Sequence, residues 1–157
     1  MMNAHEQRMC ELQADFFELS LERFSCGSEV FVFRFMHSDF AKDLDKIDDC
    51  YNFISPNNLI SLMKEKYESL SITKGEKYPA LVMRWIGYIY RAYCIINKTS
   101  SNRVYKDLKA ETLLSLFNSF HTFSPEYCVE RLKEIVDQDK KDTRTDYEIY
   151  KAIMEEN

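Results

Sequence analysis

The chain has 157 residues, and a domain of this length buries about two-thirds of the surface that its unfolded chain exposes, so it needs neither a metal ion nor a disulfide to fold. Its 45% hydrophobic and 30% charged residues, with a net charge of −5, are typical of a folded globular protein and argue against a disordered tail. The three glycines, Gly27, Gly75 and Gly87, stand too far apart to form a glycine-rich loop for nucleotide phosphates or for a dinucleotide, which argues against two large enzyme classes.

The five cysteines match neither a zinc knuckle, nor a CxxC redox pair, nor a short disulfide framework. They are Cys10, Cys26, Cys50, Cys94 and Cys128. Free cysteines behave as small buried hydrophobic groups in a reducing compartment, so we interpret them as structural thiols of a cytoplasmic protein. The N-terminal residues lack the apolar core of a signal peptide, and the longest uncharged stretches, 50–63 and 112–125, are too short to span a bilayer. We therefore expect no membrane partner.

The first expected element is a helix over residues 3–25, because apolar residues recur there at helical spacing among acidic ones. In residues 28–45, the spacing of apolar residues favours a helix, whereas the valines and phenylalanines are residue types that favour a strand. If this segment is a helix capped by Ser28, five of its residues lie on one stripe: Val30, Phe33, His37, Phe40 and Leu44. We favour the helix over the strand, because a single strand would have no partner to pair with.

A short acidic connection follows, with Asp43, Asp45, Asp48 and Asp49. Ser55 caps a helix that starts at Pro56 and ends near Tyr67, and residues 69–77 are typical of a loop. The longest apolar run of the chain comes next and predicts a helix over residues 79–97 that is apolar nearly all round. Such a helix must be wrapped by others, so we expect it at the centre of the fold.

Four further helices are expected at residues 100–108, 110–120, 126–135 and, as an appended tail, 137–157. Serine caps predict the starts of the first and third, and Thr145 with Glu148 three residues later predicts a capping box for the tail helix. The predicted fold class is all-α, a compact single-domain bundle over residues 1–157 with about six to eight helices around the central helix.

Basic charge is concentrated in residues 84–109, which hold six basic residues and one acidic residue between two acidic flanks. Arg84, Arg91 and Lys98 repeat every seven residues and so follow one narrow helical stripe that also contains Gly87. We expect this stripe to face solvent or an acidic partner. Basic residues interleaved with aromatic ones are favoured at protein interfaces and on nucleic-acid surfaces. The candidate partner-binding residues are Arg84, Trp85, Gly87, Tyr88, Arg91, Lys98, Arg103, Tyr105 and Lys106.

The central helix and the short helix after it also resemble a helix-turn-helix, in which Arg103 and Lys106 would face DNA. Any helical hairpin with a serine cap has this layout, and a helix buried at the centre of a fold is poorly suited to reading a DNA groove. A DNA-binding regulator is therefore the alternative function, and a solvated basic face is a third interpretation.

The sequence offers no recognisable catalytic constellation. Its histidines, His5, His37 and His121, show neither the spacing of metal-binding motifs nor a pairing with serine or cysteine. We interpret His121 as a capping group at the end of a helix. We predict no catalytic, cofactor-binding or metal-binding residue, and a protein that is not an enzyme.

Three segments resemble, in this order, a family of short uncharacterised bacterial proteins: RWIGYIYRAY at 84–93, TSSNRVYKDLK at 99–109 and FHTFSPEYCVERLKEI at 120–135. The family pattern is W-[IM]-G-Y-[IM]-Y-R, then S-S-x-x-V-Y-K, then H-[TS]-x-[DS]-P-x-x-A-[IV]-E-R, and the likeness covers about residues 8–136. This chain departs from the usual pattern at Ser124 and Cys128, both conservatively.

That family is associated with small toxin–antitoxin-like gene clusters in bacterial and mobile-element genomes, and the resemblance implies an antitoxin-type binder without a known active site. The expected function is a protein-binding module that neutralises a partner, either a toxin or a host effector. It would then be an antitoxin-like protein or an inhibitor from a phage or mobile element.

Overall fold

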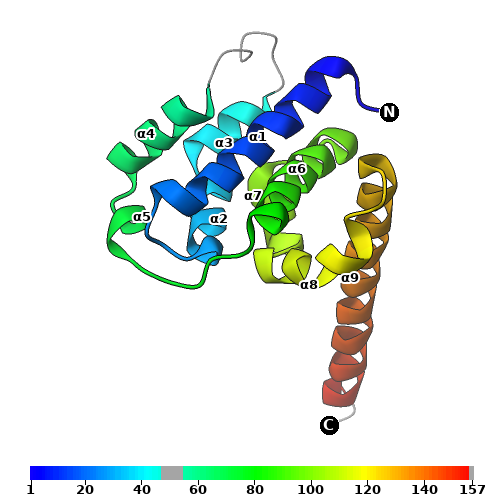
Figure 1. Ribbon diagram of the computed structural model, residues 1–157. Helices are drawn as coiled ribbons and strands as arrows, with labels where there is room; N and C mark the ends of the chain where they lie inside the picture. Colours follow the sequence, from blue (N-terminus) through cyan, green and yellow to red (C-terminus); the bar gives the residue numbers. More distant parts are fainter. Residues whose placement is uncertain (47–54, 156–157) are drawn as a thin grey trace.

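The computed structural model describes residues 1–46 and 55–155, without the side chains of residues 143–146, and helix is the only regular secondary structure within these ranges (Figure 1). The nine helices found there confirm the predicted all-α class. They are α1 (Ala4–Arg23), α2 (Ser28–Met36), α3 (Asp39–Asp45), α4 (Pro56–Lys66), α5 (Ser69–Ile72), α6 (Ala80–Asn97), α7 (Ser101–Asp107), α8 (Ala110–Phe120) and α9 (Pro125–Glu155).

Helix α6 is the central helix, as its apolar composition predicts. It packs along α1 most extensively, and α7, α8 and α9 cover its other sides (Figure 1). Pro79 precedes its first turn, and Lys98 ends it in the left-handed conformation with a φ of 51°. A helix that is buried on most of its surface must be apolar on most of its surface, which explains why this segment shows no clean amphipathic period.

Serine residues begin three helices at the predicted positions. The side chains of Ser55, Ser100 and Ser124 each accept a hydrogen bond from the backbone N–H three residues further on, at 3.2–3.3 Å. These bonds satisfy backbone donors that the first helical turn leaves free, so the local sequence is sufficient to place these helix starts.

Residues 28–45 are helical, as favoured above, but they form two helices rather than one. Ser38 begins α3 by accepting a hydrogen bond from the backbone N–H of Ala41 at 3.1 Å. The predicted stripe does not face the core: Val30 and Phe33, both on α2, are exposed by 39% and 46%. The buried face of α2 instead carries Phe31 and Phe35.

The aromatic residues on the buried face of α2 pack against aromatic residues of α1 in the core. Phe31 and Phe35 meet Phe16 and Phe17 of α1 with ring centroids 5.1–5.3 Å apart. Aromatic pairs in such tilted or edge-to-face arrangements stabilise a core beyond the area that they bury. Helix α2 is apolar on both faces, so its period alone does not determine which face packs.

Ser28 does not cap α2, contrary to the prediction. Gly27 occupies the cap position, and the hydroxyl of Ser28 accepts a hydrogen bond from the backbone N–H of Tyr78 at 2.9 Å. The loop that contains Gly75 crosses here so closely that a Cβ on Gly27 would lie 3.0 Å from the Cα of Gly75. Both glycines lie between helices, and the close approach of two backbones explains their lack of a side chain.

The predicted loop over residues 69–77 contains one helical turn, α5, and the predicted tail helix does not exist as a separate element. Helix α9 runs without a break from Pro125 to Glu155, so the predicted start at Thr145 is wrong, and the side chain of Thr145 lies outside the described residues. Ion pairs between successive turns, such as Lys133 with Asp137 at 3.3 Å, stabilise α9. No glycine or proline follows Pro125 to interrupt it.

The four cysteines within the described ranges are free and buried, as expected of structural thiols, and Cys50 lies outside those ranges. None of the helices described combines the length and the apolar composition needed to cross a membrane.

Candidate partner-binding groove

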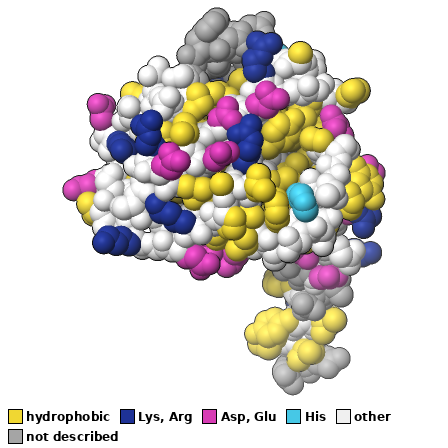
Figure 2. All heavy atoms as spheres, viewed as in Figure 1, with side chains coloured by type: hydrophobic (Ala, Val, Ile, Leu, Met, Phe, Trp, Pro, Cys, Tyr) yellow, Lys and Arg dark blue, Asp and Glu magenta, His cyan; other side chains and the backbone are white. Residues whose placement is uncertain are grey.

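A groove of about 410 Å³ opens between the first turns of α6 and the region where α8 ends and α9 begins. Figure 2 shows hydrophobic side chains gathered on this face of the molecule, beside a histidine. The residues that line it are Leu81, Arg84, Trp85, Tyr88, Ile89, Phe117, His121, Phe123 and Pro125. The groove therefore joins segments that are about 30 residues apart in the chain.

One wall of the groove is a ridge along α6. Leu81, Trp85 and Tyr88 are four and three residues apart, a spacing that places them on the same side of a helix. Leu81 is 74% exposed, whereas Trp85 and Tyr88 are partly buried against the core. The Trp85 ring meets Phe117 of α8 edge to face, with centroids 5.6 Å apart. Packing on two helices holds this wall in place before any partner binds.

His121 ends α8 and forms part of the opposite wall. Its Nδ1 lies 2.8 Å from the carbonyl oxygen of Phe117, and its ring stacks on the Phe117 ring with centroids 4.4 Å apart. The carbonyl can only accept, so Nδ1 donates the hydrogen bond. This geometry is that of the predicted helix-capping group.

Arg84 stands at the edge of the groove and is held by carboxylates of α1. Its guanidinium donates to Asp15 and, at 3.5 Å, to Glu18. The hydrogen bond to Asp15 is the main cause that raises the pKa of Arg84 above its ordinary value. On its other side, Arg84 borders a second hollow of about 300 Å³, which is also lined by Asp15, Glu18, Leu19, Glu22, Pro56 and Asn57.

Tyr88 lies in an acidic surrounding. Burial is the largest cause that raises its pKa to about 12, and Cys10, Glu11 and Glu126 raise it further. The phenol is therefore neutral at physiological pH, and carboxylates from both α1 and α9 lie near the groove. The groove thus offers an apolar floor, a positive group that is already paired, and an acidic border.

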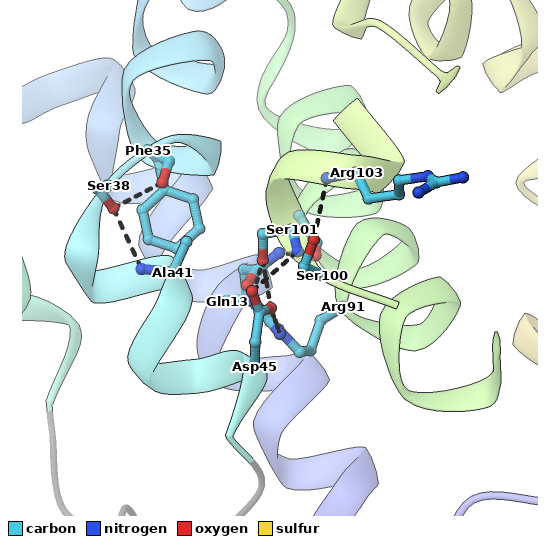
Figure 3. Close-up of polar contacts among 10 residues, drawn as sticks. Gln13, Phe35, Ser38, Ala41, Asp45, Arg91, Ser100, Ser101 and Arg103 are labelled. Carbon is cyan, nitrogen blue, oxygen red and sulfur yellow. Dashed lines mark hydrogen bonds and ion pairs between the residues drawn. The ribbon is translucent and has the colours of Figure 1, made fainter. Parts of the chain in front are cut away.

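Arg91 contradicts the predicted basic stripe, because it is 1% exposed and points into the protein (Figure 3). It donates hydrogen bonds to Gln13 at 2.9 Å, to Asp45 at 2.7 Å and to Ser101 at 2.8 Å. Ser101 in turn donates its backbone N–H and its hydroxyl to Asp45, at 2.9 Å and 2.6 Å. A charge this deeply buried needs such a complete set of partners, so Arg91 joins α1, α3, α6 and α7 and faces no solvent.

Asp45 was expected in an acidic connection with Asp43, but both belong to α3. Asp48 and Asp49 lie outside the described residues.

Gly87 also lies inside the molecule, where α6 crosses α1. A Cβ on Gly87 would lie 2.8 Å from the carbonyl oxygen of Gln13 and 2.8 Å from Cγ of Phe17. The Gln13 amide donates a hydrogen bond to the carbonyl of Gly87 at 2.9 Å. The glycine thus permits close helix packing and is not available to a partner.

The remaining predicted site residues do not line the groove. Lys98, Arg103 and Lys106 are exposed at the end of α6 and on α7, so a basic surface exists there and the DNA-binding alternative stays a prediction. Tyr105 is mostly buried and packs against the rings of Phe33 and His37.

Of the predicted residues, only Arg84, Trp85 and Tyr88 come together in the groove. The predicted set did not include Leu81, Ile89 or the groove residues within 117–125. The spacing of Leu81, Trp85 and Tyr88 was a usable signal for the α6 wall, whereas no local pattern connects residues 117–125 with α6.

Within the described residues, no group of three or more histidine, cysteine, aspartate or glutamate side chains could hold a metal ion. Comparison with known proteins finds no matching family model, no similar curated protein and no similar solved structure.

Proposed function

We propose that this chain is a non-enzymatic binding module that neutralises a partner protein by docking a segment of that partner in the groove. The observation that carries the proposal is the accessible apolar groove with Trp85 and Tyr88 in its wall. Contiguous apolar surface on a protein of this size marks an interaction site, and tryptophan and tyrosine contribute most to the binding energy of such sites.

The role fits the resemblance to bacterial proteins of toxin–antitoxin-like gene clusters. The partner is then a cytoplasmic toxin or host effector, and the chain acts as an antitoxin-like protein or as an inhibitor from a phage or mobile element. Inhibition needs no chemistry from the groove: covering a functional surface of the partner is sufficient.

The rigid wall supports tight docking. Trp85 is held by Phe117, and the wall residues that face the core are already ordered, so little side-chain entropy is lost when a partner binds.

A single charge in the groove tests the proposal. Leu81→Glu places a carboxylate at the mouth of the groove, and because Leu81 is 74% exposed, the fold should tolerate the change. We expect this variant to lose co-purification with the product of the neighbouring gene and to lose protection against its toxicity.

The matched control is Leu62→Glu, the same substitution at an exposed leucine of α4, outside the groove. It should keep both properties. If the Leu81→Glu protein captures and neutralises the partner as well as the control does, the groove is not the docking site and the proposal is wrong.

A further inference from the structure

The border of the groove carries an excess of negative charge along α1. Glu11, Asp15, Glu18 and Glu22, which we call the acidic stripe, are four, three and four residues apart and therefore lie on one side of this helix. The stripe extends over about 16 Å at the rise of an α-helix. It runs beside α6, the helix against which α1 packs most extensively.

Much of the stripe is available to a partner. Glu11 and Glu22 are exposed and form no ion pair among the described residues, whereas Asp15 and Glu18 share the single guanidinium of Arg84. Basic groups lie near the two ends of the stripe. Arg8 precedes it in α1; at its other end Arg23 donates to Asn57 at 2.8 Å, and Lys77 donates to the carbonyl oxygens of Leu21 and Phe24 at 2.6 Å and 2.8 Å.

Glu126 of α9 adds one more negative charge in the neighbourhood of the groove, where it contributes to the raised pKa of Tyr88. Carboxylates thus outnumber guanidinium groups around the apolar floor. The surface is complementary to a segment that combines apolar side chains with positive ones.

We propose that the docking segment of the partner is a cationic amphipathic helix, an inference that rests on the proposed function of the groove. The apolar face of this helix fills the groove over Trp85 and Leu81, and its lysine or arginine residues lie along the acidic stripe. Helices commonly bind in this way, with their apolar face in a groove formed by other helices. Opposite charge at the border accelerates the encounter and selects against acidic segments.

Trp85 provides a direct measurement, because it is the only tryptophan of the chain and lines the groove. The probes are two tryptophan-free synthetic helical peptides with the same leucine face, one flanked by lysines and the other by glutamates. Titrated into the full-length protein at low salt, the lysine peptide should shift the Trp85 emission and bind at least about tenfold more tightly than the glutamate peptide. Its affinity should fall as salt is added, because the stripe is exposed.

Two pairs of variants locate the charge effect. Glu11→Gln with Glu22→Gln removes two carboxylates that hold no structural partner among the described residues, and it should weaken the lysine peptide several-fold. Glu65→Gln with Glu68→Gln removes the same charge from exposed positions of α4 and the turn after it, and it should have no effect. The glutamate peptide serves as the reference in both proteins.

Three outcomes would overturn the inference: equal affinity for the two peptides, binding of neither, or a loss of affinity that is the same in the two double variants. In each case the proposed function is judged separately, by the effect of Leu81→Glu on capture of the partner.

Discussion

At the level of single residues, Arg91 is a buried charged group whose stability depends on several hydrogen-bond partners. Its guanidinium is planar and presents its donors in a fixed fork, and here the donors meet an amide oxygen, a carboxylate and a hydroxyl. The partners come from three other helices, α1, α3 and α7. The cluster therefore helps to fix the position of α3, which also packs Ala41 and Leu44 into the core.

Removal of the carboxylate should destabilise the protein strongly. In Asp45→Ala, the buried charge of Arg91 loses its only ion pair among the described residues, and we expect the free energy of unfolding to fall by about 3–5 kcal/mol. Urea denaturation followed by circular dichroism measures this change. The control Asp43→Ala, on the same helix but without an ion pair in the described structure, should shift the free energy by at most about 0.5 kcal/mol. Equal effects of the two substitutions would contradict the structural role of the cluster.

At the scale of helices, α9 consists of two parts with different environments. Cys128, Val129, Leu132 and Val136 are buried against the body, whereas the side chains described from Tyr147 onward are exposed. Figure 1 shows the corresponding part of the ribbon extending away from the other helices. Lys140 of α9 makes an ion pair with Asp107 of α7, at 3.3 Å.

A chain that ends at Asp142 should therefore be as stable as the full-length protein. It retains the residues of α9 that are buried in the described structure and the pair between Lys140 and Asp107, so we expect the melting temperature to change by less than about 2 °C. Leu132→Ala is the contrasting change in the packed part and should cost about 2–5 kcal/mol, because it leaves a cavity in the core. A truncation that lowered the melting temperature as much as Leu132→Ala does would show that the exposed part stabilises the fold.

At the scale of the whole molecule, weakly acidic groups are buried in their neutral form. Burial is the main cause that raises the pKa of Cys10 and Cys128 to about 12 and that of Cys94 to about 11, from an ordinary value of 9.0. Tyr93 is similar, with a pKa raised from 10.0 to about 12. These groups keep their protons in the folded protein at a pH at which the unfolded chain has already lost them.

The stability of the protein should consequently decrease at alkaline pH. The contribution of these groups is fully present below pH 9, where the thiols are neutral in both states, and it is lost as the pH rises toward about 12, because the unfolded chain releases its protons first. Urea midpoints measured at several pH values between 7 and 11 test this expectation. The decrease should persist in high salt, which screens exposed charges but not buried groups. A constant midpoint between pH 8 and 10.5 would contradict it.

Local sequence patterns were sufficient to predict the helical class, the place of the central helix and the helix starts at Ser55, Ser100 and Ser124. These features depend on interactions within a few residues: a serine hydroxyl reaches the N–H of the next turn, and an apolar run must be covered wherever it lies. The absence of glycine and proline after Pro125 was the local sign of one long helix, and the apparent capping box at Thr145 obscured it.

Three features could be seen only in the folded chain: which face of α2 is buried, that Arg91 is internal, and which segments build the groove. Each of these depends on groups distant in the chain. Arg91 can be buried because Gln13 and Asp45 reach it, and a spacing of seven residues along one helix contains no information about them. The groove exists because Phe117 of α8 folds onto Trp85 of α6. Periodicity describes how side chains are distributed around one helix, whereas burial and binding surface depend on what the rest of the chain places against it.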